Sequence, residues 1–542
     1  MKIVIIGGVA AGTKTAAKLR REDPSAEVVI LTKSKDISYA GCGLPYYVSR
    51  VIPERSQLFV NTPESFEALT GAKVYNNTEV TALDRAAKTV TAVCEGVETV
   101  HSYDKLVIAV GASPIRPNVP GVELENVFYM GSPEDADALK AAVDGGSIKR
   151  AMVVGGGLIG LEVAENLSAC GVKVSVIDIA PQVLPNLLDA EMAGYVENCL
   201  AEEGVMPFTG VGLEGILGET KVEKVQTSKR AMKADACVLA LGFRPNTGFL
   251  QESGLEMIRG TLVVDGQMRT SDPDIYACGD CAIVSHRLTG ERRWSAMGST
   301  ANICGRIAAR SIAGKEVQPH PGVLSTGVAK LPGINMGRTG LTEKEALALG
   351  MEVETVVAVS DDKAHYYPGS NPFIIKLIAD KASHKLLGLQ VLGKGAVDKI
   401  TDIAVVALSM GATLEDLQYC DFAYAPPFST AIHPFETAVN ILLNKLDGAY
   451  ETMTPAQFAA GAAEDYKIVD TSIAPSLPNA SYIQLTEVNG EIEGYGKDEK
   501  LLLVCNKGRR AYLLQNRMKF FGYTNTKVLE GGTTFTPSLL EE

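Results

Sequence analysis

The chain has 542 residues, of which 46% are hydrophobic and 21% are charged, and it contains 53 glycines and ten cysteines. At roughly 150 residues per domain this length predicts three or four domains with large apolar cores, and the composition excludes a disordered chain. The formal net charge of -13 argues against a general nucleic-acid or anionic-membrane surface, although local cations can still bind anionic cofactors.

The N-terminal stretch MKIVIIGGVAAG lacks the longer apolar region and the cleavage site of a signal peptide. Apolar segments elsewhere stay well short of the ~20 residues that span a bilayer. We therefore expect a cytoplasmic protein without a membrane partner. In a reducing compartment the cysteines should be mostly free thiols, and those that matter should be catalytic rather than structural.

The first stretch, KIVIIGGVAAGTKTAAKLRRED, predicts a buried strand, a tight glycine turn and a helix, which is the opening of a dinucleotide-binding unit. Gly7, Gly8 and Gly12 let the turn close, so that the helix N-terminus can approach a pyrophosphate. The fingerprint is imperfect, because Val9 stands at the middle glycine position. Thr32 stands where a carboxylate commonly holds a ribose 2′-hydroxyl. A plain βα turn in a parallel sheet is the alternative.

A single cysteine, Cys42, follows the second predicted strand in the stretch SYAGCGLPYY and precedes an apolar helix. The position five residues later is Tyr47, and no second cysteine lies nearby. Cys42 is therefore either a buried structural residue or a thiol whose redox partner comes from outside the local chain. Thiolate formation at pH 7 needs about 2 kcal/mol of stabilisation, part of which a helix N-terminus can supply.

A second dinucleotide unit begins with RAMVVGGGLIGLEVAENLSACGVKVSVID, which carries the full fingerprint at Gly155, Gly157 and Gly160. Asp178 ends the next predicted strand. Its carboxylate suits a ribose 2′,3′-diol and would repel a 2′-phosphate, which favours NADH over NADPH. Two such units in one chain predict two bound dinucleotides.

Three further stretches sharpen this assignment: YDKLVIAVGASP at 103–114, LALGFRPN at 239–246 and TSDPDIYACGDCA at 270–282. Together with the two fingerprints they resemble the two-dinucleotide-domain flavoprotein disulfide reductase family over about residues 1–445. The resemblance implies that the first unit holds FAD, with Asp280 on the ribityl chain, and that the second holds NADH. The cofactor contacts that it implies are Gly7, Gly8, Ala11, Gly12, Thr32, Lys33, Val80, Ala109, Gly111, Asp280 and Gly298 for FAD, and Gly155, Gly157, Leu158, Ile159, Gly160, Asp178 and Gly242 for NADH.

Cys278 and Cys281 form a C-x-x-C pair inside the last of these stretches, which by itself suggests a thiol-redox or metal pair. Because they flank Asp280, we interpret them as small residues around a flavin contact. A zinc site would need a second cysteine pair or a histidine cluster, so we expect no metal. The other cysteines are expected to fill the core, namely Cys94, Cys170, Cys199, Cys237, Cys304 and Cys420.

Within the family, SYAGCGLPYY most resembles the branch of coenzyme A-disulfide reductases and CoA-dependent persulfide reductases. The resemblance implies that Cys42 recruits its second thiol from coenzyme A and forms a Cys42–S–S–CoA mixed disulfide. It also implies CoA contacts at Lys18, Arg21 and Ser38; Lys14 shares the helix face, for which a merely solvated surface is the alternative. Related NADH oxidases and peroxidases cycle one cysteine through a sulfenic acid but usually lack the Pro-Tyr that follows here.

The stretches AHYYPGSNP and FAYAPPFS resemble the family's C-terminal dimerisation domain. The resemblance implies that Tyr366 and Tyr424 of the partner subunit approach the cysteine, where a phenol can protonate a departing thiolate. Packing in a domain core is the alternative for both tyrosines. His433 lies in AIHPFETAVN, where the family commonly has a Lys-Asp-Pro run, and either acid-base work or a structural role is open to it.

The chain then continues for about 90 residues. KLLLVCNKGRRAYLLQNRMKFFGYTNTKVLEGG predicts a buried strand, a loop, an amphipathic helix and another strand, and the loop could stabilise an anionic sulfur. The loop resembles that of a rhodanese-like domain, Cys-x-x-Gly-x-Arg, at Cys505, Gly508 and Arg510. Ser472 stands where that family often has an arginine, so an inactive domain that binds or senses is the alternative.

The predicted fold is α/β, with two Rossmann-like dinucleotide-binding domains, an α+β dimerisation domain and a C-terminal rhodanese-like domain. The predicted boundaries are 1–112 and 251–322 for the FAD domain, 113–250 for the NAD(H) domain, 323–446 for the dimerisation domain and 455–542 for the rhodanese-like domain.

The predicted function is that of a homodimeric NADH-dependent flavoprotein. It would reduce CoA-linked persulfide, polysulfide or CoA disulfide through Cys42, with Cys505 as a carrier of sulfane sulfur. The alternatives are an NADH oxidase or peroxidase, a thioredoxin-reductase-like enzyme that uses Cys278 and Cys281, and a non-enzymatic redox sensor.

Overall fold

The computed structural model describes residues 1–541 and divides into two compact units. The first comprises Met1–Ile179 and Val205–Val323, and the second comprises Ala180–Gly204 and Leu324–Glu542. Each unit is described by itself. Helix α6 (Ala190–Glu202) groups with the second unit, although its residues lie within the predicted NAD(H) domain.

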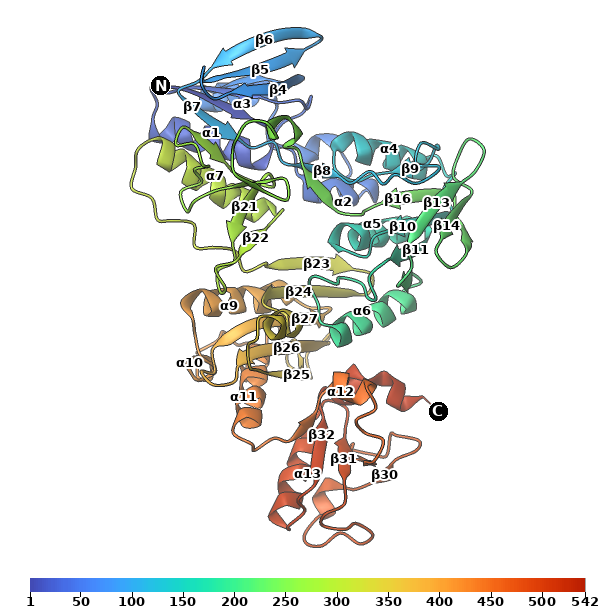
Figure 1. Cartoon of the computed structure of the whole chain (residues 1–542). Helices are drawn as coiled ribbons and strands as arrows, with labels where there is room; N and C mark the ends of the chain where they lie inside the picture. Colours follow the sequence, from blue (N-terminus) through green and yellow to red (C-terminus); the bar gives the residue numbers. More distant parts are fainter. Residues whose placement is uncertain (542) are drawn as a thin grey trace. The chain divides into compact units, whose positions relative to one another are not determined.

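A five-stranded parallel sheet with the order β20-β7-β1-β2-β3 opens the first unit. Figure 1 labels its strand β7 and the nearby helix α1. Its strands are β1 (Lys2–Ile6), β2 (Glu27–Leu31), β3 (Lys73–Tyr75), β7 (Lys105–Ile108) and β20 (Ile275–Ala277). The central strands are rich in β-branched residues and fully buried, as in sheets covered on both faces. Because β20 pairs with β7, chain segments on either side of the second fingerprint build one sheet.

Two helices of this region pack closely, α1 (Ala10–Glu22) and α7 (Gly298–Ile312). A Cβ atom at Gly305 would lie 2.8 Å from the carbonyl oxygen of Ala11, so only glycine permits this approach. Three smaller sheets also belong to the first unit. One consists of β4 (Thr78–Asp84), β5 (Thr89–Cys94) and β6 (Val97–Ser102), and another is the pair β8 (Ala112–Pro114) and β17 (Phe243–Pro245). The third consists of β18 (Met257–Ile258), β19 (Thr261–Val263), β21 (Ala282–Ser285) and β22 (Arg292–Trp294).

The second Rossmann-like sheet of the first unit has the order β12-β11-β10-β16-β9 and is also parallel. Its strands are β9 (Val127–Phe128), β10 (Arg150–Val154), β11 (Lys173–Asp178), β12 (Met206–Thr209) and β16 (Ala236–Leu239). Helices α4 (Pro133–Asp144) and α5 (Leu158–Ala169) belong to it, as does the antiparallel sheet of β13 (Leu213–Leu217), β14 (Lys224–Thr227) and β15 (Ala231–Lys233).

The second unit contains an antiparallel sheet with the order β23-β24-β27-β26-β25, so β25 forms one edge. Its strands are β23 (Gly327–Leu331), β24 (Ile334–Gly340), β25 (Val353–Asp361), β26 (Pro372–Asp380) and β27 (Leu386–Gly393). The helices are α8 (Glu343–Ala348), α9 (Val397–Met410), α10 (Leu414–Leu417) and α11 (Pro434–Leu446).

A buried ammonium group, that of Lys376, lies in the middle of this unit with 1% of its side chain exposed. Its Nζ is 3.0 Å from Asp189 Oδ2 and 2.6 Å from Glu343 Oε2, and it also pairs with Glu191. Burial lowers the pKa of Lys376, but the three carboxylates outweigh it and raise that pKa above the ordinary value. The ammonium of Lys376 therefore occupies the space between the three carboxylates, so this acidic cluster is not a metal site.

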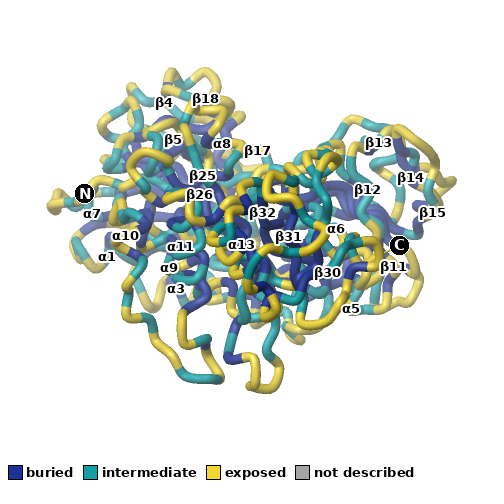
Figure 2. Tube along the Cα trace, turned by 90° about the horizontal axis from the view of Figure 1, so that it is seen from below, coloured by how far each residue is buried: buried dark blue, intermediate teal, exposed yellow. Residues whose placement is uncertain are grey.

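The C-terminal part of the second unit is a parallel sheet with the order β28-β32-β31-β29-β30. Its strands are β28 (Thr452–Met453), β29 (Lys467–Asp470), β30 (Ser481–Tyr482), β31 (Leu501–Val504) and β32 (Thr526–Leu529). The helices are α12 (Pro455–Ala459), α13 (Arg509–Phe520) and α14 (Gly532–Phe535). Strand β31 is fully buried, as its dark blue trace in Figure 2 shows. Its alternating residues belong to two apolar clusters, one on each face.

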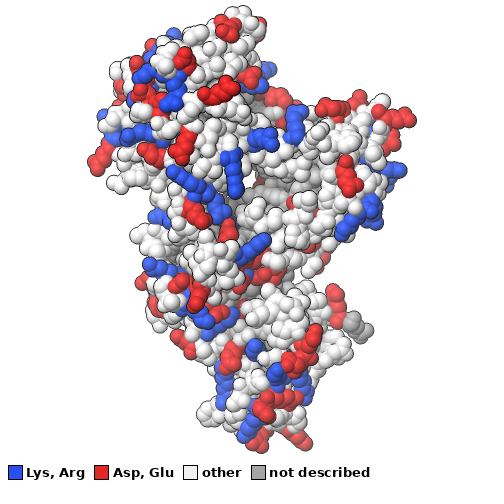
Figure 3. Space-filling view, in the orientation of Figure 1, with Lys and Arg blue, Asp and Glu red and all other residues white. Residues whose placement is uncertain are grey.

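The predicted fold class is confirmed: the two Rossmann-like sheets are followed by an α+β sheet domain and a C-terminal α/β domain. Among the described residues, no helix is both long and apolar enough to cross a membrane. On the face drawn in Figure 3, basic and acidic side chains are interspersed.

Candidate functional site

The first glycine turn joins β1 to α1 and has the backbone geometry of a dinucleotide site. Gly7 has a φ of 111°, and a Cβ atom there would lie 2.1 Å from the carbonyl oxygen of Ala109. A Cβ at Gly12 would lie 1.9 Å from the carbonyl oxygen of Gly7. These contacts leave the N-terminus of α1 open to a phosphate. Gly8 and Ala11 lie in the same turn, so the structure brings these four predicted residues together.

The other residues predicted to contact FAD lie in the same unit. Thr32 is buried at the end of β2, whereas Lys33 is exposed and pairs with Glu79 at 2.9 Å. Val80 is buried on β4. Ala109 and Gly111 follow β7, and Gly298 begins α7.

Asp280 follows β20, and its surroundings indicate whether this unit can hold the ribityl chain of FAD. Burial raises the pKa of its carboxyl group, and among residues 1–541 no donor or cation contributes to that shift. A half-buried carboxylate with unmet acceptor capacity suits the hydroxyl groups of a ribityl chain. The residues present therefore fit FAD.

The second glycine turn joins β10 to α5 and repeats the geometry. Gly155 has a φ of 114°, and a Cβ at Gly160 would lie 1.9 Å from its carbonyl oxygen. A Cβ at Gly157 would meet no atom within 4 Å, so the space in front of the helix is open. Asp178 Oδ2 accepts a hydrogen bond from Gly156 N at 2.7 Å, which places a carboxylate beside the turn. Leu158 and Ile159 form the first turn of α5, and Gly242 has a φ of 95°. The arrangement fits a dinucleotide with a ribose diol.

Cys42 lies in a short 3-10 turn, Gly41–Gly43, that leads directly into helix α2 (Leu44–Val48). It is a free thiol, and of the ten cysteines, all within the described residues, it alone is exposed. The buried structural role that the sequence left open for Cys42 is therefore wrong. A thiol that can react with a small molecule must be accessible, and this one is.

The helix N-terminus was expected to supply part of the stabilisation of the Cys42 thiolate, and that contribution stays a prediction; the net effect of the chain's own groups on the pKa of Cys42 is the opposite. Although Cys42 is exposed, the protein around its sulfur partly excludes water and raises the pKa of the thiol; the carboxylates of Glu162 and Asp280 raise it further, and a backbone hydrogen bond opposes them. Helix α2 has only five residues, so its N-terminus is a weak source of positive potential. The chain's own groups therefore disfavour the Cys42 thiolate.

Glu162 on α5 is a site residue that sequence reasoning missed. Ser49 donates a hydrogen bond of 2.5 Å to Asn166 Oδ1, which joins the segment after α2 to α5. Glu162 lies one helical turn before Asn166 and therefore on the same face, toward Cys42 and Tyr46. Burial and the nearby Glu165 raise the pKa of Glu162 to about 7. A glutamate inside a dinucleotide-binding helix carries no local sequence signal for such a role.

The remaining cysteines differ from Cys42. Cys278 and Cys281 are fully buried free thiols, and burial raises the pKa of each to about 12. Cys281 donates to the carbonyl oxygen of Ile108 at 3.3 Å. The interpretation of this pair as small residues in the core is supported, and a thioredoxin-reductase-like use of it is not. Two of the predicted core cysteines are buried, Cys237 and Cys304; the four that are half-buried are Cys94, Cys170, Cys199 and Cys420.

The basic residues predicted to contact CoA lie on α1. Lys18 forms an ion pair with Glu22, to which Arg310 of α7 also binds at 3.1 Å. Arg21 is exposed in the last turn of α1. Ser38 has a φ of 53°, and its N–H donates to the carbonyl oxygen of Gly8 at 2.9 Å. The structure thus brings Ser38 to the first glycine turn.

Tyr366 and Tyr424 meet in the second unit, although 58 residues separate them in the chain. Their hydroxyl oxygens are 3.5 Å apart, and 65% and 47% of the two side chains are exposed. The hydrogen bond from Tyr366 raises the pKa of Tyr424. Core packing, the alternative role, is therefore wrong for both tyrosines.

Cys505 lies directly after β31, and Gly508, with a φ of 83°, precedes the first residue of α13. The predicted strand, loop, helix and strand are thus present. Cys505 is only 3% exposed. Arg510 donates to the carbonyl oxygen of Thr471 and to Gln484 Oε1, each at 2.8 Å, so its guanidinium braces the loop. Ser472, in place of an arginine, donates its N–H to Asp470 at 2.8 Å.

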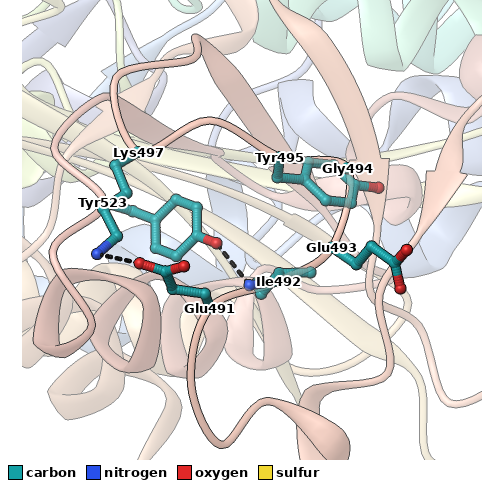
Figure 4. A pocket seen from close by; sticks show the side chains of 7 residues that line it. All are labelled: Glu491, Ile492, Glu493, Gly494, Tyr495, Lys497 and Tyr523. Carbon is teal, nitrogen blue, oxygen red and sulfur yellow. Dashed lines mark hydrogen bonds and ion pairs between the residues drawn. The ribbon is translucent and has the colours of Figure 1, made fainter.

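A surface pocket of about 560 Å³ lies elsewhere in the C-terminal domain (Figure 4). Its polar groups bind one another: Lys497 pairs with Glu491 at 2.7 Å, and Ile492 N donates to the hydroxyl oxygen of Tyr523 at 2.7 Å. Cys505 does not line it. The pocket is therefore not the sulfur site.

Two family models match the chain. The model for the pyridine nucleotide-disulphide oxidoreductases covers residues 1–301, and the model for the dimerisation domain of the same family covers residues 330–434. The chain belongs to the pyridine nucleotide-disulphide oxidoreductase family. Members of this family are oxidoreductases, so the chain is an enzyme, and the redox-sensor alternative is set aside.

Family relatives match most of the chain. It is 35% identical over 442 residues to an NAD(P)H coenzyme A polysulfide/persulfide reductase of Pyrococcus horikoshii, covering 81% of this chain and 98% of the relative. It is 34% identical over 449 residues to an NADH oxidase of Methanocaldococcus jannaschii, covering 82% and 99%.

Two solved family structures match the chain over nearly its whole length, including the C-terminal domain. The structure of an NAD-dependent persulfide reductase from A. fulgidus has a TM-score of 0.94 at 35% identity, covering 99% of this chain and 100% of that one. The reduced CoADR-RHD structure of Bacillus anthracis has a TM-score of 0.94 at 32% identity, covering 99% and 98%.

Glu162→Gln is expected to raise the rate at which iodoacetamide alkylates Cys42 of this protein by about threefold at pH 8. Above pH 7 the Glu162 carboxylate is mostly charged and raises the pKa of Cys42, so its removal favours the thiolate. Near pH 6 Glu162 is mostly protonated, and the effect should vanish. Peptide mass spectrometry of the cofactor-bound enzyme measures the rate, with Glu223→Gln on the exposed surface as the control. Equal rates at pH 8 would contradict the assignment.

His433 is structural in this family member. It precedes α11, accepts a hydrogen bond from Phe435 N at Nδ1 (3.3 Å) and lies 4.6 Å from the ring of Phe422. Burial lowers its pKa to about 4. A buried, neutral residue that caps a helix is not placed for acid-base work, so the catalytic alternative for His433 is not supported.

His433 should make stability pH-dependent. Its pKa is lower in the folded chain than the ordinary value of 6.5, so protonation favours unfolding, and up to about 3 kcal/mol is lost as the pH falls from 6.5 to 4. His433→Asn retains the capping acceptor without the titration. Its thermal midpoint should therefore fall less over this interval than that of the unchanged protein. Parallel pH profiles for the two proteins would refute the role.

Proposed function

We propose that the enzyme reduces CoA-linked persulfide or polysulfide, or CoA disulfide, with NADH, using Cys42 as its one reacting thiol. The observation that carries this proposal is that Cys42 alone of the ten cysteines is exposed, in the unit that fits FAD. With no second protein thiol beside it, the partner sulfur must come from the substrate. Relatives named as CoA-dependent sulfur reductases support a CoA thiol in this role.

The reaction of Cys42 can be written for a CoA persulfide. The Cys42 thiolate attacks the CoA-bound sulfur of CoA–S–SH, the S–S bond breaks, and hydrosulfide leaves. The product is Cys42–S–S–CoA. An electron pair, which bound FAD and NADH together would supply, then returns Cys42 and CoA to thiolates. For CoA disulfide the leaving group is CoA thiolate instead, and the rest is unchanged.

Three sets of residues serve this chemistry in the proposal. Lys18, Arg21 and Ser38 bind CoA; in the structure Lys18 pairs with Glu22, which also binds Arg310. Tyr366 and Tyr424 of the partner subunit protonate or stabilise the departing sulfur, for which their hydroxyl contact of 3.5 Å and their exposure are suited. Glu162 holds a proton near Cys42.

The proposal includes a homodimer. Exposed aromatic and aliphatic side chains surround the tyrosine pair in sequence, namely Tyr367, Tyr419, Phe428 and Ile432, and a second copy would cover them. The match to the family's dimerisation domain supports this. We also propose a cytoplasmic location, because all ten cysteines are free thiols.

Cys505 is proposed as a carrier of sulfane sulfur. Its thiolate would attack the outer sulfur of a persulfide R–S–SH, releasing the thiol R–SH and leaving a Cys505 persulfide anion. Attack by a CoA thiolate on the outer sulfur of that persulfide would then give CoA persulfide and restore Cys505. The strand-loop-helix position of Cys505 and Gly508 supports this role.

The mass of the Cys42 peptide tests the proposal. Enzyme isolated without reductant should carry one coenzyme A on that peptide, and NADH should release it. A relative named NADH oxidase favours the competing function, in which Cys42 forms a sulfenic acid, Cys505 is irrelevant and oxygen is consumed rapidly. An oxidised Cys42 peptide without CoA, together with rapid oxygen uptake, would establish the oxidase instead.

A further inference from the structure

Strand β25 is an edge strand that contacts or leads into two loops of the second unit, namely the loop that carries Tyr366 and the loop that follows Cys505. Its last residue, Asp361, leads directly into the loop 362–371, which carries Tyr366. That loop is closed at its base, because Asp362 and Asn371 exchange two hydrogen bonds of 2.9 Å. The other edge of β25 faces the C-terminal domain, whose contacts with it follow one another along the strand.

The central contact is the carboxylate of Glu530, which follows β32 and is 1% exposed. Its Oε2 accepts from Val357 N of β25 at 2.8 Å, and its Oε1 accepts from Lys445 Nζ at 2.8 Å and from Thr452 Oγ1 at 2.6 Å. Burial lowers the pKa of Lys445, but Glu530 and Glu354 outweigh it and raise that pKa. A buried charge so fully paired is costly to separate, so this point is fixed.

The segment after Glu530 packs against the backbone of Cys505 and Asn506. Gly532 lies so close that a Cβ there would be 2.0 Å from the carbonyl oxygen of Cys505. Thr533 N donates to that same oxygen at 3.1 Å, and Thr534 Oγ1 donates to Asn506 Oδ1 at 2.7 Å. This packing agrees with the 3% exposure of Cys505. A thiol so enclosed cannot meet a donor sulfur until its loop or the segment 531–534 moves.

The weak point of this docking is the ion pair between Lys507 Nζ and Asp361 Oδ1, at 2.6 Å. Lys507 belongs to the Cys505 loop, and its side chain is 35% exposed; that of Asp361 is 25% exposed. A partly exposed pair is screened by salt and contributes little free energy, unlike the buried Glu530 network. The pair therefore opens before the network does.

We propose that Lys507 and Asp361 are positioning residues that hold the Cys505 loop closed, so that opening of this ion pair exposes Cys505 for sulfur exchange. Because Asp361 ends the strand that leads to Tyr366, a movement of the Tyr366 loop would reach Cys505 through the pair. This rests on the proposed function only in that Cys505 carries sulfur. The closed geometry stands without it.

Alkylation of Cys505 in the intact, cofactor-bound enzyme tests the proposal. Asp361→Asn and Lys507→Met should each raise the rate of iodoacetamide modification of the Cys505 peptide about three- to tenfold, with no change at Cys42. Lys500→Met, which breaks the exposed Lys500–Asp465 pair of the same domain, is the control and should behave as the unchanged protein. In the unchanged protein 0.5 M salt should also raise the Cys505 rate.

Equal Cys505 rates in the unchanged protein, Asp361→Asn and Lys507→Met would overturn the proposal, as would fast modification in the unchanged protein. A sulfur readout keeps this result apart from the proposed function. NADH-dependent reduction of CoA disulfide does not need Cys505, so its rate should be unaltered in both variants. Transfer of sulfur from a persulfide donor to Cys505 should become faster in both, because the opened ion pair exposes the thiol. If the alkylation rates rise but no sulfur is ever found on Cys505, the carrier role fails and the positioning role remains.

Discussion

Cys42→Ser is expected to lower NADH-dependent reduction of CoA persulfide and CoA disulfide by a factor of about a thousand or more. A serine hydroxyl is a far weaker nucleophile than a thiol and cannot form the mixed disulfide with CoA. Cys42 is the one exposed cysteine, so no other thiol can take its place. Stopped-flow mixing with NADH should show flavin reduction in both proteins and a long-wavelength thiolate–flavin band only in the unchanged enzyme.

The matched control for this result is Cys94→Ser, which changes a half-buried cysteine at the end of β5. It should retain both the band and the activity, because its thiol is not in the candidate site. Turnover of Cys42→Ser at a rate near that of the control would show that Cys42 is not the reacting thiol. Loss of flavin binding in Cys42→Ser would be seen in its absorption spectrum, and it separates a folding defect from a chemical one.

Lys376→Met is expected to destabilise the second unit by about 3 to 5 kcal/mol. The ammonium of Lys376 pairs with Asp189, Glu191 and Glu343, and methionine would leave the buried Asp189 and the two partly buried glutamates without this cation. Asp189 would retain its hydrogen bonds from Gln390 and from the backbone of α8, which limits the loss. Thermal unfolding followed by calorimetry should show a lower midpoint for the transition that contains this unit.

The control for this prediction is Lys381→Met, which removes an exposed lysine just after the same strand. It should change the midpoint very little, because exposed charges contribute little to stability. At acid pH the difference in thermal midpoint between Lys376→Met and the unchanged protein should become smaller. Nearby Lys376 lowers the pKa of Asp189 against the effect of burial, so that stabilisation is present at neutral pH and lost as the carboxylate protonates. Equal midpoints at pH 7 would refute the role of the cluster.

Local spacing made much of the fold predictable. The glycines at 7, 8 and 12 and at 155, 157 and 160 are dictated by contacts within one strand-turn-helix unit, so the sequence showed both dinucleotide sites. Runs of buried apolar residues marked β1, β10 and β31 for the same reason. The lone cysteine and the rhodanese-like loop were visible because each motif is contiguous in the chain.

Contacts between distant segments were not predictable, since no spacing rule joins them. The pKa of Cys42 is raised by Glu162 and Asp280, which lie on other elements, and the sequence suggested the opposite direction. The role of His433 depended on its Nδ1 bond and on the ring of Phe422. The domain boundaries and the approach of Tyr366 and Tyr424 to Cys42 stay predictions.

The sequence by itself determined which thiols this enzyme has, where its two dinucleotide turns lie, and that a Cys-x-x-Gly-x-Arg loop follows them near the C-terminus. These are properties of short contiguous segments, in which backbone geometry is set by neighbouring residues. The tertiary structure alone decided that Cys42 is exposed and that Cys505 is buried. Exposure and electrostatic environment are sums over neighbours brought together by folding, and for Cys505 those neighbours include Val469 and Ala511, which lie far from it or on another element of the same unit.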